Sequence, residues 1–94
     1  MNTAFDIHNI AYWQVWKIHL VGGRYIKVLE DYSIKTNDSH SIISRYFKAG
    51  KDDIIEMQHG DGRLFFVPKS NILYIEDCGI IKNENYRAGD MSAL

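Results

Sequence analysis

Apolar residues recur with a period of two over much of this chain, which is the period of a β-strand because successive side chains point to opposite faces. The densest region is 53–77, which holds β-prone runs at 54–59, 63–67 and 72–75. Gly60-Asp61-Gly62 separates the first two runs. Glycine and aspartate tolerate the positive φ of tight turns, so this tripeptide favours a hairpin. The region therefore predicts a hairpin followed by a further strand.

The second run of this region is apolar on both faces. Leu64 and Phe66 share one face, and Phe65 and Val67 share the other. Such a run is typical of a strand that is covered on both sides, near the middle of a sheet. Pro68 has no N–H to give to a ladder and should end this strand at a bend. We expect the last run to resume after that bend and to stop near residues 76–77.

The N-terminal half predicts another hairpin. Residues 13–20 alternate, with Trp16, Ile18 and Leu20 on one face. The two glycines in Val21-Gly22-Gly23-Arg24 favour a tight turn. The return strand is expected over residues 24–31.

A helix is predicted between the two hairpins. Its apolar residues fall on one helical stripe, made of Ile42, Ile43, Tyr46 and Phe47. Polar residues at 37–39 are the candidate N-caps, and Gly50 is the expected left-handed C-cap. A helix of about 10–12 residues is too short to be stable alone, so its stripe should pack on the sheet.

The predicted order is β-β-α-β-β-β, which indicates the α+β class. Tight turns between short strands favour a small antiparallel sheet or a partly open barrel with one central helix. We expect a single domain at residues 13–82, an N-terminal arm at 1–12 and a mobile C-terminal tail at 83–94.

One local pattern resembles a known family. Residues 62–75 read G-x-x-F-F-V-P-x-x-N-I-x-Y-I. This is similar to the closing strands of Sm-like and other SH3-like barrels, and the resemblance implies that the sheet curves toward a barrel. Those barrels usually place their helix first, whereas the helix predicted here is central, so no functional residue is carried over.

Composition and charge narrow the functional classes. The 94 residues are 46% hydrophobic and 24% charged, with a formal net charge of −1 and basic residues scattered singly. Non-specific phosphate binding draws on a concentrated basic face, and no such run stands out. Cys78 is the single cysteine, and neither a signal-like nor a membrane-length apolar segment is present. We expect a cytoplasmic protein that makes no membrane contact.

No residue pattern typical of catalysis or metal binding is found. The histidines are not spaced as a metal set; they are His8, His19, His40 and His59. A G-x-S-x-G elbow and a phosphate loop are also missing from the sequence. We therefore predict no catalytic residue, metal or cofactor, and no enzyme activity. A cleft that joined His19, His59 and Asp61 would be the exception.

Aromatic residues are abundant for a core of this size. Two Trp, six Tyr and four Phe are more than it can easily hide, so some should lie at an interface. Residues 13–20 and 80–81 are the candidate edge strands, and unblocked edges recruit further strands. We predict a non-enzymatic module that binds proteins and forms a homo-oligomer. A small bacterial or phage accessory or inhibitor protein would work in this way. The expected interface residues are Trp13, Val15, Tyr25 and Tyr74.

Aromatic and basic residues that lie close together suggest an alternative function. Single-strand binders stack bases on aromatic rings along a basic groove. The alternative is therefore a single-stranded nucleic-acid-binding protein with an Sm-like or OB-like sheet. Its candidate residues are Trp16, Lys17, Arg24, Lys27 and Arg45.

Overall fold

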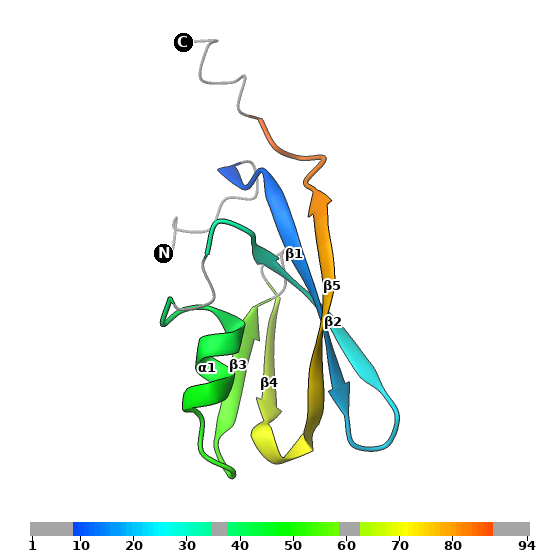
Figure 1. The fold of residues 1–94 in the computed structure, drawn as a ribbon, viewed down its shortest axis with the longest axis vertical. Helices are drawn as coiled ribbons and strands as arrows, with labels where there is room; N and C mark the ends of the chain where they lie inside the picture. The colour runs from blue at the N-terminus through cyan, green and yellow to red at the C-terminus, as the bar shows by residue number, and fades with distance from the viewer. Residues whose placement is uncertain (1–8, 35–37, 59–62, 88–94) are drawn as a thin grey trace.

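The computed structural model describes residues 9–34, 38–58 and 63–87. Its elements are β1 (Tyr12–Leu20), β2 (Tyr25–Asp31), α1 (Ile42–Lys48), β3 (Ile54–Gln58), β4 (Leu64–Pro68), the 3-10 turn η2 (Lys69–Asn71) and β5 (Ile72–Lys82) (Figure 1). This order confirms the predicted α+β class with a central helix. The expected turn at Gly60-Asp61-Gly62 lies outside the described residues.

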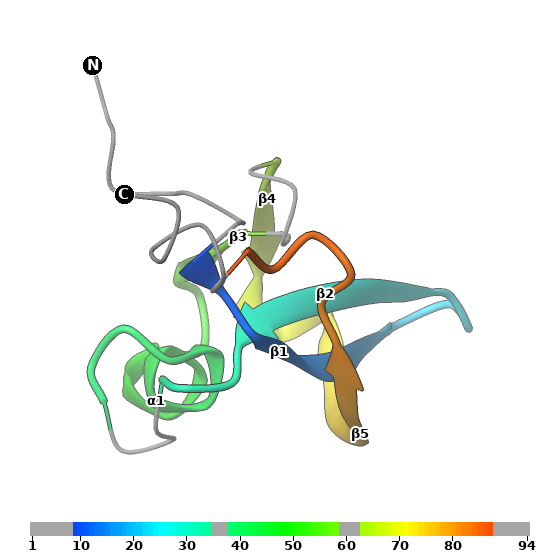
Figure 2. The same ribbon diagram turned by 90° about the horizontal axis from the view of Figure 1, so that it is seen from above.

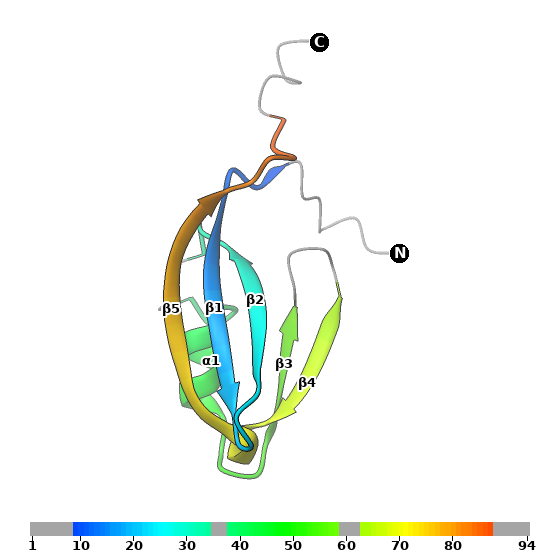
Figure 3. The same ribbon diagram turned by 90° about the vertical axis from the view of Figure 1, so that its right-hand side faces the viewer.

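The strands form two antiparallel sheets. One has the order β2-β1-β5 and the other pairs β3 with β4. The prediction that residues 13–20 form an edge strand is wrong, because β1 is the central strand, with β2 on one side and β5 on the other. Figure 3 shows the strands following one another as β5, β1, β2, β3 and β4 around a curved layer. Among the described residues no ladder joins β2 to β3, so the barrel is not closed.

The bend predicted at Pro68 is where the chain crosses between the sheets. Pro68 ends β4, and η2 carries the chain into β5. The backbone N–H of Lys69 donates to the carbonyl of Asp53, 2.8 Å away, and that of Val21 donates to the carbonyl of Asn71, 2.9 Å away. These bonds attach the crossing point to the start of β3 and to the turn after β1.

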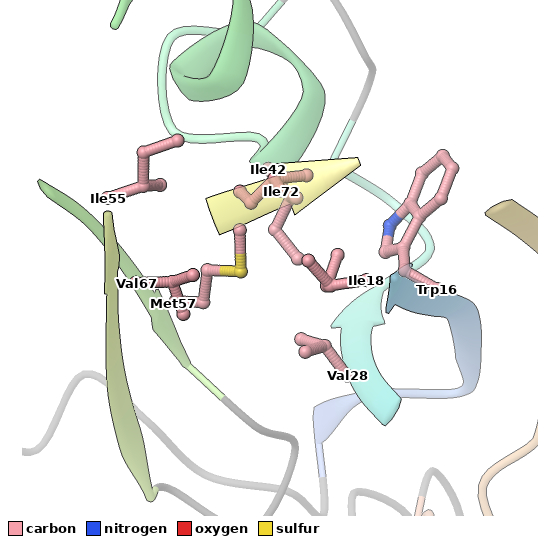
Figure 4. Packing of buried hydrophobic residues seen from close by; sticks show 8 residues of the cluster. All are labelled: Trp16, Ile18, Val28, Ile42, Ile55, Met57, Val67 and Ile72. Atoms are coloured by element: carbon pink, nitrogen blue, oxygen red, sulfur yellow. The ribbon is translucent and has the colours of Figure 1, made fainter. Parts of the chain in front are cut away.

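The core lies between the two sheets, and α1 contributes to it. Its buried residues come from α1 and from all five strands: Trp16, Ile18, Val28, Ile42, Ile55, Met57, Val67 and Ile72. Figure 4 shows Met57 and Val67 pointing from the hairpin toward Ile18 and Val28. Full burial of each such side chain stabilises the fold by about 1.5–3 kcal/mol.

The helix is shorter than predicted and has different caps. It spans 7 residues, and its N-cap is Ser41, whose hydroxyl accepts from the N–H of Ser44 at 3.0 Å. Gly50 is not a left-handed cap, because only Gly22, Gly23 and Gly79 have a positive φ among the described residues. The carboxylate of Asp53 accepts from the N–H of Gly50 at 2.7 Å, so the chain leaves the helix in an extended conformation.

The apolar stripe of α1 is also narrower than predicted. Ile42 is buried, and Ile43 and Tyr46 pack against the core. Phe47 is 74% exposed, so its expected packing on the sheet is wrong. Tyr46 and Ala49, on either side of Phe47 in the sequence, do pack against the core, so Phe47 is exposed because it lies on another side of the helix.

β4 is not covered on both sides as predicted. It pairs with β3 alone among the described residues, and only the face with Val67 and Phe65 packs on the core. Leu64 and Phe66 point outward and are exposed. The β3–β4 hairpin is a two-stranded sheet. Among the described residues, no further strand pairs with β4.

β5 does not stop at residues 76–77 but continues to Lys82. A register shift against β1 falls between Gln14 and Trp16, where Gly79 has a φ of 90°. A carboxylate oxygen of Asp77 accepts from the N–H of Gly79 at 2.8 Å and from the side-chain amide of Gln14 at 2.6 Å. This β-bulge lets residues 80–81 join the same strand.

Asn83 joins the two ends of the described chain. It is 3% exposed, its side-chain amide donates to the carbonyl of Ile10 at 2.6 Å, and its backbone N–H donates to that of Ala11 at 3.0 Å. The division of the chain into an arm at 1–12, a domain at 13–82 and a tail at 83–94 stays a prediction.

Candidate binding surfaces

The β3–β4 hairpin has an apolar outer surface, here called the hairpin face. Strand alternation turns Ile55 and Met57 inward and leaves three large side chains outward. Their exposed fractions are 65% for Ile54, 63% for Phe66 and 49% for Leu64. Ladder pairing places Phe66 opposite Glu56, and Leu64 opposite Gln58. A contiguous apolar face on a monomer marks an interaction site more often than scattered apolar residues do.

The outer backbone edge of β4 lies beside this face. Among residues 9–34, 38–58 and 63–87, β4 is hydrogen-bonded to β3 only. Its sequence Leu64–Pro68 contains no charged side chain, although charges are the usual block on an exposed edge. Pro68 protects only the last position. The hairpin therefore offers an apolar face beside a strand that has one ladder partner among the described residues.

The sheet β2-β1-β5 has a different surface on the side away from the core. His19 of β1 lies between Tyr25 of β2 and Tyr74 of β5 in the ladder. The His19 and Tyr74 rings stack, with centroids 4.2 Å apart and planes 16° apart. The His19 and Tyr25 centroids lie 5.7 Å apart. Tyr25 and Tyr74 are 53% and 54% exposed.

Charged residues occupy the neighbouring row of this surface, which is here called the aromatic face. Lys17 lies opposite Lys27 on one side and opposite Glu76 on the other. Its Nζ lies 4.7 Å from the centre of the Tyr25 ring, a cation–π contact. A carboxylate oxygen of Glu76 lies 2.8 Å from Nε2 of His19 and holds that ring in place. The aromatic face comprises Lys17, His19, Tyr25, Lys27, Tyr74 and Glu76.

A groove of about 450 Å³ separates the end of α1 from the start of β3. Its walls include Arg45 and Lys48 on one side and Asp53 and Glu56 on the other. The guanidinium of Arg45 donates to the carbonyl of Glu56, which lies on β3. Both signs of charge line the groove, so it selects no ligand class by charge.

The structure separates the four residues predicted for a protein interface. Trp13 and Val15 are buried, at 7% and 4% exposure, on the central strand. Tyr25 and Tyr74 lie on the two outer strands of the same sheet and meet across His19. Sequence reasoning missed His19 as their link, although its place in the alternation of β1 was the available signal.

The residues named for nucleic acid are divided as well. Lys17 and Lys27 face each other on the aromatic face, and Arg24 lies in the turn directly before Tyr25. Trp16 is buried in the core. Arg45 lies on α1, against β3. The structure thus places Lys17 and Lys27 beside Tyr25 and Tyr74. The sequence analysis had assigned the two tyrosines to the protein interface.

Glu30 is a buried carboxylate that sequence reasoning overlooked. One oxygen accepts from the indole N–H of Trp16 at 3.0 Å, and the other accepts from the backbone N–H of Ile42 at 2.9 Å. Burial raises the pKa of the Glu30 carboxyl, and these two hydrogen bonds oppose the rise. Glu30 follows Ile26 and Val28 at a spacing of two, which places all three on the core face of β2. This spacing in the sequence could have identified Glu30 as buried.

No catalytic or metal centre is apparent in the part of the chain that the structure describes. Within it, no three His, Cys, Asp or Glu side chains gather in a way that could hold a metal ion. Cys78 is an exposed free thiol. His59 and Asp61 lie outside the described residues, so their predicted relation to His19 stays open. No helix in the described residues is long and apolar enough to cross a bilayer.

Comparison of this chain with models of protein families, with curated proteins and with solved structures gives no match.

Proposed function

We propose that this chain is a non-enzymatic binding module that acts through protein–protein contacts and that its first partner is a second copy of itself. The observation that carries the proposal is the hairpin face. Phe66 and Ile54 are each more than 60% exposed there. In a stable protein such side chains are normally covered by a partner or kept apart from one another.

A second copy fits the hairpin face for two reasons. An apolar surface is complementary to itself, and a symmetric pair is the commonest form of homo-oligomer. The formal net charge of −1 produces little repulsion between copies. Antiparallel pairing of β4 with β4 of the second copy would extend the β3–β4 sheet across the two copies. It would also place Leu64 and Phe66 of both copies on one continuous face.

A cytoplasmic location and an accessory or inhibitory role are part of the same proposal. The exposed free thiol of Cys78 suits a reducing compartment, where cysteines remain unpaired. A small binding module influences other proteins by covering their surfaces. The exposed apolar side chains of the hairpin face provide a surface for such a contact.

Sedimentation velocity from low micromolar to submillimolar concentration tests the proposal. The wild-type chain is expected to shift from monomer to dimer as its concentration rises. A variant carrying Phe66→Ser and Ile54→Ser is expected to stay monomeric while keeping its circular dichroism spectrum.

Val21→Ser is the matched control. Val21 is 57% exposed in the turn after β1, and Figure 2 shows that the β1–β2 hairpin reaches away from β3, β4 and α1. This variant should dimerise like the wild type. A wild-type chain that stays monomeric at the highest concentration would overturn the self-association, as would a dimer that Phe66→Ser and Ile54→Ser leave unchanged.

A further inference from the structure

The turn between β1 and β2, Leu73 and the aromatic face form one end of the β2-β1-β5 sheet, here called the basic end. Residues 15–29 include Lys17, Arg24 and Lys27, whereas all 12 Asp and Glu residues of the chain lie outside this stretch. Figure 2 shows the β1–β2 hairpin reaching away from β3, β4 and α1. We propose that the basic end binds a second kind of partner, a protein that presents carboxylates beside apolar side chains.

This inference extends the proposed function of a protein-binding module to a partner other than a second copy. It does not need the dimer, because the hairpin face belongs to the other sheet. The basic end and the hairpin face can therefore succeed or fail as binding sites independently of each other.

The basic end combines apolar and aromatic side chains that are exposed. The backbone N–H of Val21 donates to the carbonyl of Asn71 at 2.9 Å, which holds the turn against the start of β5. Four large side chains are each more than half exposed on these joined segments: Val21, Tyr25, Leu73 and Tyr74. Tyrosine is enriched among the residues that contribute most to protein interfaces.

Contacts within the aromatic face fix the orientation of both tyrosines. The Tyr74 ring stacks on His19, with centroids 4.2 Å apart, and Nζ of Lys17 lies 4.7 Å from the centre of the Tyr25 ring. A side chain that is already ordered loses little conformational entropy when a partner covers it. Tyr25 and Tyr74 are therefore suited to anchor a protein contact.

The cations at this end outnumber the acids beside them. Lys17 and Lys27 are direct ladder neighbours, and like charges in this arrangement destabilise a sheet. Glu76 lies opposite Lys17 on β5 but pairs with Nε2 of His19 at 2.8 Å. Arg24 in the turn adds a third cation. Carboxylates of a partner would reduce the repulsion between the lysines, so charge complementarity favours an acidic partner.

A protein fits the basic end better than nucleic acid or an anionic bilayer. Lipid-binding clusters typically hold about 4–8 Lys or Arg, and nucleic-acid binders depend on a concentrated basic surface. The His19 ring lies between Tyr74 and Tyr25, so these rings contact one another rather than offering a stack for bases. Protein interfaces combine Tyr and Arg with few other charges, which matches the composition of this end.

Selection from a random peptide library displayed on phage tests the inference, with the whole chain as the immobilised target. The enriched peptides are expected to combine Asp or Glu with apolar or aromatic residues. The same selection against the Phe66→Ser and Ile54→Ser variant should enrich the same peptides, because the hairpin face is not used. No enrichment, peptides without acidic residues, or peptides that this variant no longer selects would overturn the proposal without bearing on self-association.

Fluorescence anisotropy with a synthetic copy of the selected peptide locates its binding site. Tyr25→Ser and Arg24→Gln should each weaken binding about 10-fold, because they remove an anchoring ring and a cation. Tyr32→Ser and Lys51→Gln are the matched controls, since both residues are exposed in other turns, and they should bind as the wild type does. Circular dichroism confirms that each variant is folded.

Two results of these measurements would contradict a protein site at the basic end. One is a loss of affinity in Tyr25→Ser and Arg24→Gln that is no larger than in the controls. The other is displacement of the peptide by a DNA duplex, or by vesicles of phosphatidylcholine and phosphatidylserine, more readily than by the unlabelled peptide. The second result would assign the basic end to nucleic acid or to a membrane surface.

Discussion

The indole N–H of Trp16 donates a 3.0 Å hydrogen bond to the buried carboxylate of Glu30. The second oxygen of that carboxylate accepts from the backbone N–H of Ile42, the first residue of α1. One side chain thus joins β1, β2 and the start of the helix. This contact therefore holds the start of the helix against the β2-β1-β5 sheet.

Replacing Glu30 with alanine is expected to lower the free energy of unfolding by about 2–4 kcal/mol. The substitution leaves two buried N–H donors, on Trp16 and Ile42, without their acceptor, and each costs about 1–3 kcal/mol. Urea unfolding followed by tryptophan fluorescence measures the change. Glu84→Ala removes an exposed carboxylate and should cost less than about 0.5 kcal/mol. Equal stabilities for the two variants would show that the Glu30 contacts contribute little.

The raised pKa of Glu30 predicts a specific dependence of stability on pH. The folded state binds a proton at this carboxyl more tightly than the unfolded state, whose ordinary value is 4.5. Proton binding at Glu30 therefore stabilises the folded state, and this contribution is complete below the unfolded-state value. It is lost as pH rises through the higher pKa of the folded state. Glu30→Gln does not titrate, so the difference in unfolding free energy between wild type and variant should change with pH across this range. A difference that stays constant with pH would contradict the assignment.

Gly79 in the β-bulge of β5 provides a test of backbone conformation. Its φ is 90°, and a Cβ added there would meet no atom within 4 Å. The cost of Gly79→Ala is therefore conformational and should be about 1–2 kcal/mol. Gly79→Asn should cost less, because asparagine adopts positive φ more readily. Chemical unfolding of the two variants measures this order, and an alanine variant as stable as the wild type would show that the bulge can change its backbone shape.

The sequence was sufficient to predict the elements of the fold but not all of their neighbours. Alternation and turn-forming glycines predicted the strands, because these signals act over a few residues. The central position of β1 depends on its pairing with β5, about 60 residues later, where no local signal operates. The end of β5 was misplaced for a similar reason, since Asp77 stabilises a bulge by bonding to Gly79 and to Gln14 on β1.

The candidate surfaces were harder to predict than the strands. An apolar run such as 64–67 has the same pattern whether one face or two faces are covered, so the exposure of Phe66 required the three-dimensional structure. Tyr25 and Tyr74 were two of the four residues predicted for a protein interface, and that role stays a prediction. Their contact through His19 follows from strand register, which the sequence does not give. In the sequence, Trp13 and Val15 were as good candidates for an exposed interface as Tyr25 and Tyr74. The structure shows that both are buried.

Methyl NMR spectra over a concentration series would show whether a second copy covers the hairpin face. The methyl signals of Ile54 and Leu64 are expected to shift and broaden as the concentration rises, because their side chains enter the contact. Those of Val21 and Leu73, which are exposed outside the hairpin, are expected to stay unchanged. Signals from Ile54 and Leu64 that do not move, or that move no more than those of Val21 and Leu73, would contradict self-association through this face.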